Sequence, residues 1–194
     1  GYGTPIGTHF APHNPDYLDL TSKSKFDPEL SKKLIKEAGY NEDKIISLKL
    51  PPPSYARRGG EIVASQLRNV GLNIEITNLE WAQWLEQVFK GKDYNLTIVS
   101  HTEPSDINIY ARPNYYFQYD SAPFQKLMKD LSATTNPSNR SKLLSKAQTM
   151  ISEDYVNGYL FQLAKTGVAN SKIKGLWKNS PTQANDLTGV RWND

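Results

Sequence analysis

The stretch of the chain that could do chemistry runs from His101 to Arg112. It holds an imidazole, the carboxylates of Glu103 and Asp106, and a guanidinium group, directly after a strand expected at residues 94–99. In an open α/β sheet, ligands bind in the crevice beyond the carboxyl ends of the strands. A carboxylate in a cleft closed away from water makes a charge-assisted hydrogen bond to an ammonium group, worth about 1.5–3 kcal/mol. These four side chains are therefore candidate ligand-binding residues.

Aromatic side chains follow in the same stretch and extend the candidate wall of a cleft. Tyr115 and Tyr116 are predicted to line ligand pockets, where the ring offers an apolar face and the hydroxyl group fixes orientation. Along an extended segment, successive side chains point to opposite faces. Tyr116 would then point away from Tyr115 and Phe117, so one of the two sets is expected to lie in the core.

Each candidate also has a structural interpretation. Asp106 could cap a short turn that runs to Tyr110, and His101 and Arg112 could form structural ion pairs. Glu103 and Asp106 could instead be the acid–base pair of a hydrolase, but paired acids occur in most proteins. The chain has no G-x-S-x-G, H-E-x-x-H or phosphate-cradling glycine motif. No catalytic residue and no cofactor is therefore predicted.

The histidines near the start of the chain do not predict a metal site. The spacing of His9 and His13 would bring them together on a helix, but Pro12 and Pro15 make a helix improbable there. Together with His101 they show no spacing that enforces converging ligands. No metal site is expected.

Composition excludes several classes of protein. The chain has 194 residues, a formal net charge of +3 and no cysteine. Lysine and arginine are scattered, whereas a nucleic-acid face needs a basic stripe, so nucleic acid is not an expected partner. Disulfides, thiolate metal sites and a cysteine nucleophile are excluded. No apolar run approaches the roughly 18 residues of a membrane span. The first residues carry neither Met nor a signal peptide, which indicates a processed or excised piece.

Hydrophobic periodicity predicts helices that alternate with strands. The helices are expected at residues 28–38, 55–70 and 80–89, and the strands at residues 45–50, 72–76 and 94–99. This order is typical of an α/β fold with a helix-covered, largely parallel or mixed sheet. The residues predicted to face inward include Leu30 and Leu34 in the first helix, Ile62 in the second, and Trp81 and Trp84 in the third.

The second half of the chain is predicted to be less regular. Two helices are expected at residues 123–133 and 137–152, then a strand at 156–163 and a possible further strand at 166–169. From residue 171 the chain is rich in loops with isolated apolar residues. Such a tail cannot bury itself alone, so we expect it to pack on this domain or on another one.

Four stretches, taken in order, carry a resemblance to a known family. Residues 26–40 (FDPELSKKLIKEAGY) follow the pattern D-x-x-x-A-K-x-L-L-x-E-A-G-Y, with Ser31 where alanine is usual. Residues 59–76 (GGEIVASQLRNVGLNIEI) look like A-x-x-I-Q-x-x-L-x-x-V-G-I-x-V-x-I, and residues 80–100 (EWAQWLEQVFKGKDYNLTIVS) look like the W-x-x-x-x-x-x-G-x-Y-D turn into a strand. Residues 138–161 are similar to a late helix and strand of the same family. Together these stretches resemble the family 5 extracellular solute-binding proteins, the receptors of peptide and nickel ABC importers.

The resemblance implies a periplasmic-binding-protein-like lobe. Residues 1–170 would be the C-terminal, solute-binding lobe of a two-lobed receptor, and residues 171–194 a return segment that packs on this lobe or on the absent first lobe. The receptor would capture a peptide or similar small solute, without catalysis, for the membrane subunits of an ABC transporter. Its location would be the periplasm or the cell surface. The alternative is a non-catalytic protein-interaction module.

The resemblance also bears on the candidate carboxylates. In peptide-binding members, the loop after the strand presents an acidic residue to the α-amino group of the ligand. Here HTEPSDI replaces the usual W-x-x-D-x-x-D-P. Either Glu103 or Asp106 could therefore take this part, and the sequence leaves the choice open.

Overall fold

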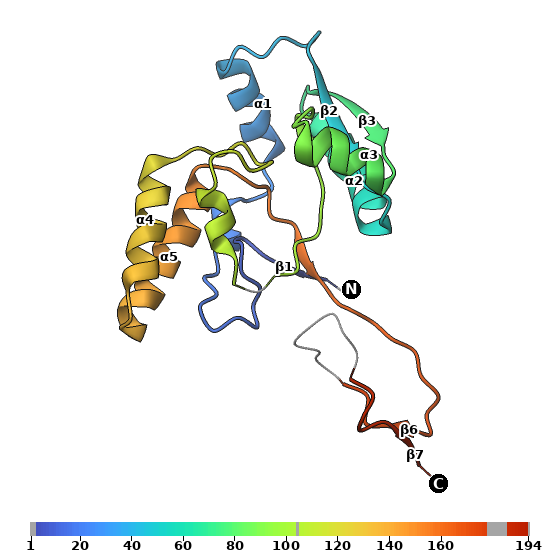
Figure 1. The fold of residues 1–194 in the computed structure, drawn as a ribbon. Helices are drawn as coiled ribbons and strands as arrows, with labels where there is room; N and C mark the ends of the chain where they lie inside the picture. The colour runs from blue at the N-terminus through green and yellow to red at the C-terminus, as the bar shows by residue number, and fades with distance from the viewer. Residues whose placement is uncertain (1–2, 104, 178–185, 194) are drawn as a thin grey trace. The chain divides into compact units, whose positions relative to one another are not determined.

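The computed structural model describes residues 3–103, 105–177 and 186–193. The chain divides into two compact units (Figure 1). The larger unit comprises Pro5–Gln162, and the smaller comprises Gly1–Thr4 with Leu163–Asp194. All the candidate site residues belong to the larger unit.

A parallel sheet forms the first half of the larger unit. Its three strands lie in the order β3 (Asn73–Asn78), β2 (Ile45–Leu50) and β4 (Leu96–Thr97), with β2 parallel to both neighbours. Leu48 and Leu50 on one face of the central strand are buried, and so is Lys49 on the other, as expected for a strand covered on both faces. The predicted α/β fold with a largely parallel sheet is confirmed, although β4 is much shorter than the strand predicted at 94–99.

Helix α1 (Pro28–Glu37) precedes β2, and helix α2 (Ser54–Asn69) connects β2 to β3. The Asp27 carboxylate accepts a hydrogen bond from the Leu30 amide and caps α1, with Pro28 at the first helical position. The helix positions are as predicted, but part of their predicted inward face is not buried. Three of these residues are exposed: Leu30 and Leu34 of α1, and Ile62 of α2. Among the described residues, α1 makes no extensive packing contact with another element, and only one face of α2 packs on the sheet.

The predicted helix at 80–89 is a short α-helix followed by a wider turn. Helix α3 (Trp81–Trp84) continues into η2 (Leu85–Lys90), which has π-helical hydrogen bonding. The widened winding changes which residues share a face. Trp84 is buried and donates a hydrogen bond from Nε1 to Thr97 in β4. Trp81 is 44% exposed, so its prediction as a core residue is wrong.

A second core lies around α4 (Ala122–Ala133) and α5 (Pro137–Glu153), which pack side by side (Figure 1). Both helices begin as predicted, because Ser121 and Asn136 accept capping hydrogen bonds and Pro stands in each first turn. The short 3-10 helix η3 (Ile107–Ala111) packs against α4. The buried residues of this core come from all three elements and from the N-terminal segment: Phe10, Ile107, Ile109, Tyr110, Phe124, Leu127, Met128, Leu131, Leu144, Ala147 and Ile151.

The remaining elements are short. They are η1 (Thr21–Lys23), β1 (Gly3–Pro5), which pairs with β5 (Phe161–Leu163), and β6 (Ile173–Lys174), which pairs antiparallel with β7 (Arg191–Trp192). The strand predicted at 156–163 is therefore limited to its last three residues, and 166–169 is not a strand. The role predicted for residues 171–194 as a return segment stays a prediction, and residues 178–185 and 194 lie outside the described part. None of the helices described is both long enough and apolar enough to cross a membrane.

Candidate functional site

The N-terminal segment is irregular, and a buried glutamine of α5 holds it in place. The Gln148 side chain is fully buried, and its Oε1 accepts hydrogen bonds from the Thr8 hydroxyl and the Leu18 amide, both at 3.2 Å. Its Nε2 donates to the Asp16 carbonyl at 2.8 Å. With Phe10 buried in the second core, these contacts fix the backbone on either side of His9. The imidazole of His9 is therefore placed by its neighbours.

The loop that follows β4 lies far from His9 in sequence but next to it in the structure. Asp106 is the residue before η3, and Ile107 and Ile109 anchor that helix in the second core. The Asp106 side chain makes no capping hydrogen bond to η3. Its predicted structural role as a turn cap is therefore wrong, and its carboxylate is available to other groups.

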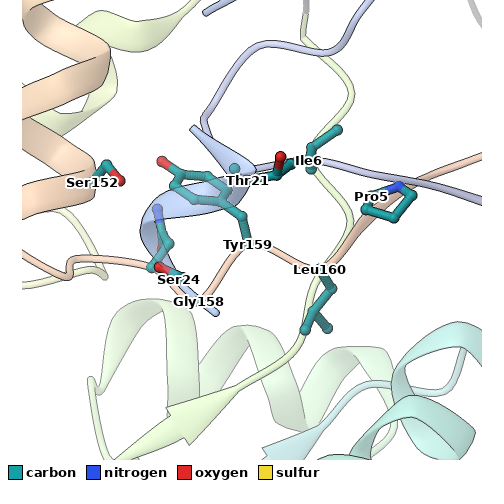
Figure 2. A pocket seen from close by; sticks show the side chains of 10 residues that line it. Pro5, Ile6, Thr21, Ser24, Ser152, Gly158, Tyr159 and Leu160 are labelled. Atoms are coloured by element: carbon teal, nitrogen blue, oxygen red, sulfur yellow. The ribbon is translucent and has the colours of Figure 1, made fainter. Parts of the chain in front are cut away.

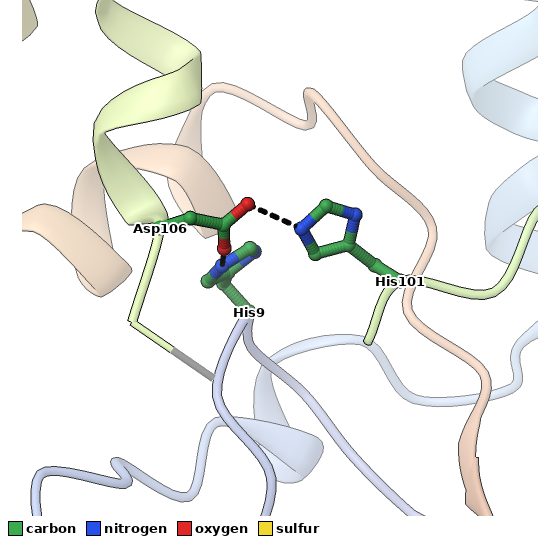
Figure 3. A group of neighbouring side chains, drawn as sticks. All are labelled: His9, His101 and Asp106. Carbon is green, nitrogen blue, oxygen red and sulfur yellow. Dashed lines mark hydrogen bonds and ion pairs between the residues drawn. The ribbon is translucent and has the colours of Figure 1, made fainter. Parts of the chain in front are cut away.

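His9, His101 and Asp106 form a compact cluster, named here the His–Asp–His cluster (Figure 3). The two oxygens of the Asp106 carboxylate face one imidazole each: Oδ1 lies 3.0 Å from Nε2 of His9, and Oδ2 lies 2.6 Å from Nε2 of His101. One donor atom from each residue lies within 4.8 Å of the others. Solvent exposure increases across the cluster: the side chain of His9 is 4% exposed and that of His101 is 35% exposed.

A second layer of polar groups orients the His9 ring. Its Nδ1 lies 3.2 Å from the Tyr110 hydroxyl, and that hydroxyl accepts a hydrogen bond of 2.6 Å from the Asn157 amide. Burial lowers the pKa of His9, and the neighbouring Asp106 carboxylate opposes this by raising it. The balance favours a neutral imidazole, which has a lone pair to offer.

Glu103 contacts the cluster, and Arg112 and Tyr115 contact each other. The Glu103 carboxylate is 64% exposed and lies 3.5 Å from Nε2 of His101. The guanidinium of Arg112 lies over the Tyr115 ring, 5.4 Å from its centroid. Burial raises the pKa of the Tyr115 hydroxyl, the positive charge of Arg112 lowers it, and the charges of Asp106 and Glu103 raise it further. Direct contacts therefore join His101, Glu103 and Asp106, and a separate contact joins Arg112 and Tyr115.

Tyr116, the sixth predicted site residue, lies in the core. It is 6% exposed and packs with Leu79, Trp84 and Val88, and burial raises the pKa of its hydroxyl. Tyr116 is the buried member, but the predicted alternation is wrong: the segment is a turn, so the rings of Tyr115, Tyr116 and Phe117 contact one another instead of pointing to opposite faces. A ligand contact through Tyr116 stays a prediction, and its burial favours a supporting role behind Tyr115.

A hollow lies elsewhere in the larger unit. It has a volume of about 220 Å³ and is lined by residues that include Ile6, Thr21, Ser152, Tyr159 and Leu160 (Figure 2). Ligand pockets usually have about 300–1,000 Å³. None of the predicted site residues lines it. The candidate site is therefore the loop after β4.

Sequence reasoning found the acidic loop but missed His9. The three residues of the cluster come from an irregular N-terminal segment and a loop, and neither has a periodic pattern that places side chains on a shared face. The sequence contains only a weak indication of the role of His9. The residue follows Thr8 and precedes Phe10, in a segment whose apolar residues are expected to pack on a core. Arg112 has the extended backbone that a following proline favours.

Comparison with known proteins shows the family of the chain. The family described as bacterial extracellular solute-binding proteins, family 5 Middle, matches residues 1–122. The chain belongs to this family. The resemblance seen in the sequence motifs is confirmed.

Curated relatives in this family match the chain over part of their own length. The dipeptide-binding protein of Escherichia coli K12 is 26% identical over 154 residues, which are 72% of this chain and 28% of the relative. The periplasmic oligopeptide-binding protein OppA of the same organism is 29% identical over 168 residues, which are 79% of this chain and 30% of the relative. The chain therefore spans less than a third of the length of these two relatives.

Solved structures of the family share the fold. A dipeptide-binding protein from Pseudoalteromonas sp. SM9913 in complex with Met-Leu has a TM-score of 0.75 and 22% identity, and the match covers 100% of this chain and 41% of that one. DppA from Helicobacter pylori in complex with the peptide STSA has a TM-score of 0.80 and 19% identity, with 100% and 40% covered. The predicted periplasmic-binding-protein-like α/β fold is confirmed.

Proposed function

We propose that this chain is the ligand-binding lobe of a receptor that captures a peptide or similar small solute for an ABC importer, without catalysis. The observation that carries the proposal is the polar segment that follows β4, with Glu103 and Asp106 beside His101 and, after η3, Arg112 over the Tyr115 ring. This loop lies beyond the carboxyl end of a parallel strand, where open α/β sheets bind ligands. The curated relatives named above bind dipeptides and oligopeptides, which supports a peptide as the solute.

Glu103 is the better placed of the two carboxylates to hold the α-ammonium group of a peptide. Both oxygens of Asp106 already face an imidazole, whereas the Glu103 side chain is largely exposed. A carboxylate–ammonium hydrogen bond is charge-assisted and strengthens once a cleft closes and excludes water. Asp106 then contributes by fixing His101, which lies beside Glu103.

Arg112 and Tyr115 supply the complementary chemistry for the rest of the solute. The guanidinium carries five donors that suit a carboxylate or a peptide carbonyl. Its position over the Tyr115 ring limits its motion, so less conformational freedom is lost on binding. The ring of Tyr115 offers an apolar face and a hydroxyl group.

The proposed partners follow from the shared family. A second lobe of the same receptor would cover the loop, and closure of the two lobes would be a hinge motion that the solute favours by touching both. The membrane subunits of an ABC transporter would receive the solute. The compartment is the periplasm or the outer surface of the cell, because the family is extracellular.

Thermal unfolding of the complete gene product tests the proposal. Free dipeptides and tripeptides, with EDTA present, are expected to raise the unfolding temperature, and the same peptides with an acetylated N-terminus are expected to have a much smaller effect. Glu103→Gln keeps the shape of the side chain but removes its charge, and this variant is expected to lose most of the rise. Glu61→Gln is the matched control on the exposed side of α2.

Three results would contradict the proposal or its assignment. Equal shifts in wild type and Glu103→Gln would remove Glu103 from the site. A loss in Asp106→Asn with none in Glu103→Gln would assign the anchor to Asp106. The absence of a shift with every peptide would overturn the peptide itself as the solute.

A further inference from the structure

We propose that the His–Asp–His cluster is a binding site for a late first-row divalent metal ion such as Zn²⁺, Ni²⁺ or Cu²⁺. The protein ligands would be Nε2 of His9, Nε2 of His101 and the carboxylate of Asp106. The proposal rests on the geometry of the cluster and stands apart from the proposed peptide site, although the two adjoin at His101 and Glu103.

Each histidine nitrogen lies close to a coordinating separation from an oxygen of Asp106. A metal ion bound about 2.0–2.2 Å from three donors holds them roughly 3–3.5 Å apart. The two histidine nitrogens lie 3.0 Å and 2.6 Å from the nearest Asp106 oxygens, and one donor atom from each residue lies within 4.8 Å of the others. Metal binding would bring the two imidazoles closer together, and the partly exposed His101 ring is the one with room to move. The buried His9 ring needs no large movement.

The surroundings of His9 are those of a metal-binding imidazole. A ligating histidine usually has its other ring nitrogen held by a polar group, which fixes the ring and its tautomer. Here that group is the Tyr110 hydroxyl, itself held by Asn157. Coordination at Nε2 puts the ring proton on Nδ1, from which it can be donated to the Tyr110 oxygen. Tyr110 and Asn157 are positioning residues and are not ligands.

The donor types select the class of metal. Imidazole nitrogens suit Zn²⁺, Cu²⁺ and Ni²⁺, whereas Ca²⁺ and Mg²⁺ prefer oxygen ligands throughout. The negative charges of Asp106 and of the nearby Glu103 attract a divalent cation to the cluster. Three protein ligands leave at least one position open, which water or a donor atom of a captured solute can fill.

The alternative is that the cluster is a hydrogen-bonded clip that ties the N-terminal segment to the loop after β4. In a clip, the two histidines donate to Asp106 and no metal is required. The two accounts differ in one measurable respect, because a clip gives no saturable metal binding that depends on His101.

Metal titration of the complete gene product tests the proposal. The protein is freed of metal with a chelator and titrated with Zn²⁺ and Ni²⁺ by calorimetry, and with Co²⁺ by its visible absorption, in the absence of peptide. Wild type is expected to bind one ion per molecule, and His101→Ala is expected to bind it much more weakly. The affinity of this variant is expected to fall by about 100-fold or more, because even partners outside the coordination sphere cost 10–100-fold. His101 is exposed, so the variant is expected to fold.

His13 provides the matched control among the three histidines of the chain. It lies outside the cluster and contacts Gln162, so His13→Ala is expected to bind the ion as wild type does. Equal binding in His101→Ala and wild type would overturn the proposal and leave the clip, as would a similar loss in both histidine variants. Mg²⁺ bound as tightly as Zn²⁺ would also contradict it.

The two proposals can fail separately. Glu103→Gln is expected to lose peptide-dependent stabilisation and to keep most of the metal affinity, and His101→Ala is expected to show the larger loss with metal. Peptide binding without metal binding would overturn the metal site alone. Metal binding without any peptide effect would overturn the peptide receptor alone.

Discussion

Nε2 of His9 lies 3.0 Å from an oxygen of Asp106, although 97 residues separate the two in sequence. The contact joins an irregular N-terminal segment to the loop after β4. It depends on two cores that are each built from local periodic elements, and on one polar residue, Gln148, that fixes the irregular segment. The candidate site therefore depends on a part of the chain that has no regular structure of its own.

Replacing Gln148 with leucine is expected to lower the free energy of unfolding by about 1–3 kcal/mol. The change is close to isosteric, but it leaves the Asp16 carbonyl and the Thr8 and Leu18 donors without their partner, and buried polar groups without partners are costly. Urea unfolding followed by circular dichroism measures the effect. Gln66→Leu, at an exposed position of α2, is expected to stay within about 0.5 kcal/mol of wild type. Similar values for both variants would show that Gln148 does not hold the segment.

The regular part of this fold could be predicted from the sequence. Strand β2 and helices α1, α2, α4 and α5 lie within a residue or so of their predicted bounds, because capping residues and apolar periodicity act locally and leave a visible pattern. The parallel sheet follows from the alternation of these elements. Local signals could not show that α3 would widen into a π-helical turn, since that depends on what Trp84 packs against.

The candidate site could be predicted only in part. The loop with His101, Glu103 and Asp106 is visible as a change from an apolar strand to a polar segment. His9 could not be found in this way, because its contact with Asp106 is a consequence of tertiary packing. The same holds for Trp81 and for the exposed leucines of α1, because helical spacing shows which residues share a face but not what covers that face.

The two adjacent glycines of α2 are expected to respond in opposite directions to alanine. A Cβ at Gly60 would lie 2.3 Å from Cδ1 and 3.2 Å from Cγ of the fully buried Leu50, whereas a Cβ at Gly59 would meet nothing within 4 Å. Gly59→Ala should stabilise the protein by about 1 kcal/mol through helix propensity. Gly60→Ala should destabilise it by about 1–3 kcal/mol, because Leu50 cannot move without disturbing the core. Chemical unfolding of both variants under the same conditions tests the pair, and a stabilised Gly60→Ala would refute the close packing of α2 on β2.

Tyr94 is expected to contribute to a loss of stability in alkali. Burial raises the pKa of its hydroxyl to about 12, and the hydroxyl donates a hydrogen bond of 2.6 Å to the Tyr116 carbonyl. Because the pKa in the folded state exceeds the ordinary value of about 10, the unfolded state loses its proton first as pH rises. The contribution is therefore fully present below about pH 10 and is lost between about pH 10 and 12.

The variant Tyr94→Phe separates this contribution from those of the other tyrosines. It should be less stable than wild type at neutral pH by about 0.5–1.5 kcal/mol, since one hydrogen bond is lost. Its stability should then fall less steeply than that of wild type above about pH 10. Tyr155→Phe is the control, because Tyr155 is 80% exposed, and it should follow the wild-type curve. Parallel curves for wild type and Tyr94→Phe would contradict the assignment.

Tyr110 is expected to tune the proposed metal site without touching the ion. Tyr110→Phe removes the group that faces Nδ1 of His9, so the ring loses the partner that fixes its tautomer. The affinity for Co²⁺ should fall by about 10-fold, and the visible absorption of the bound ion should change, because the imidazole donor is oriented differently. Tyr119→Phe is the matched control: Tyr119 also packs against Phe124, but its hydroxyl contacts Asp154. A purely structural role for Tyr110 predicts lower thermal stability with an unchanged Co²⁺ spectrum, and that result would remove Tyr110 from the support of the site.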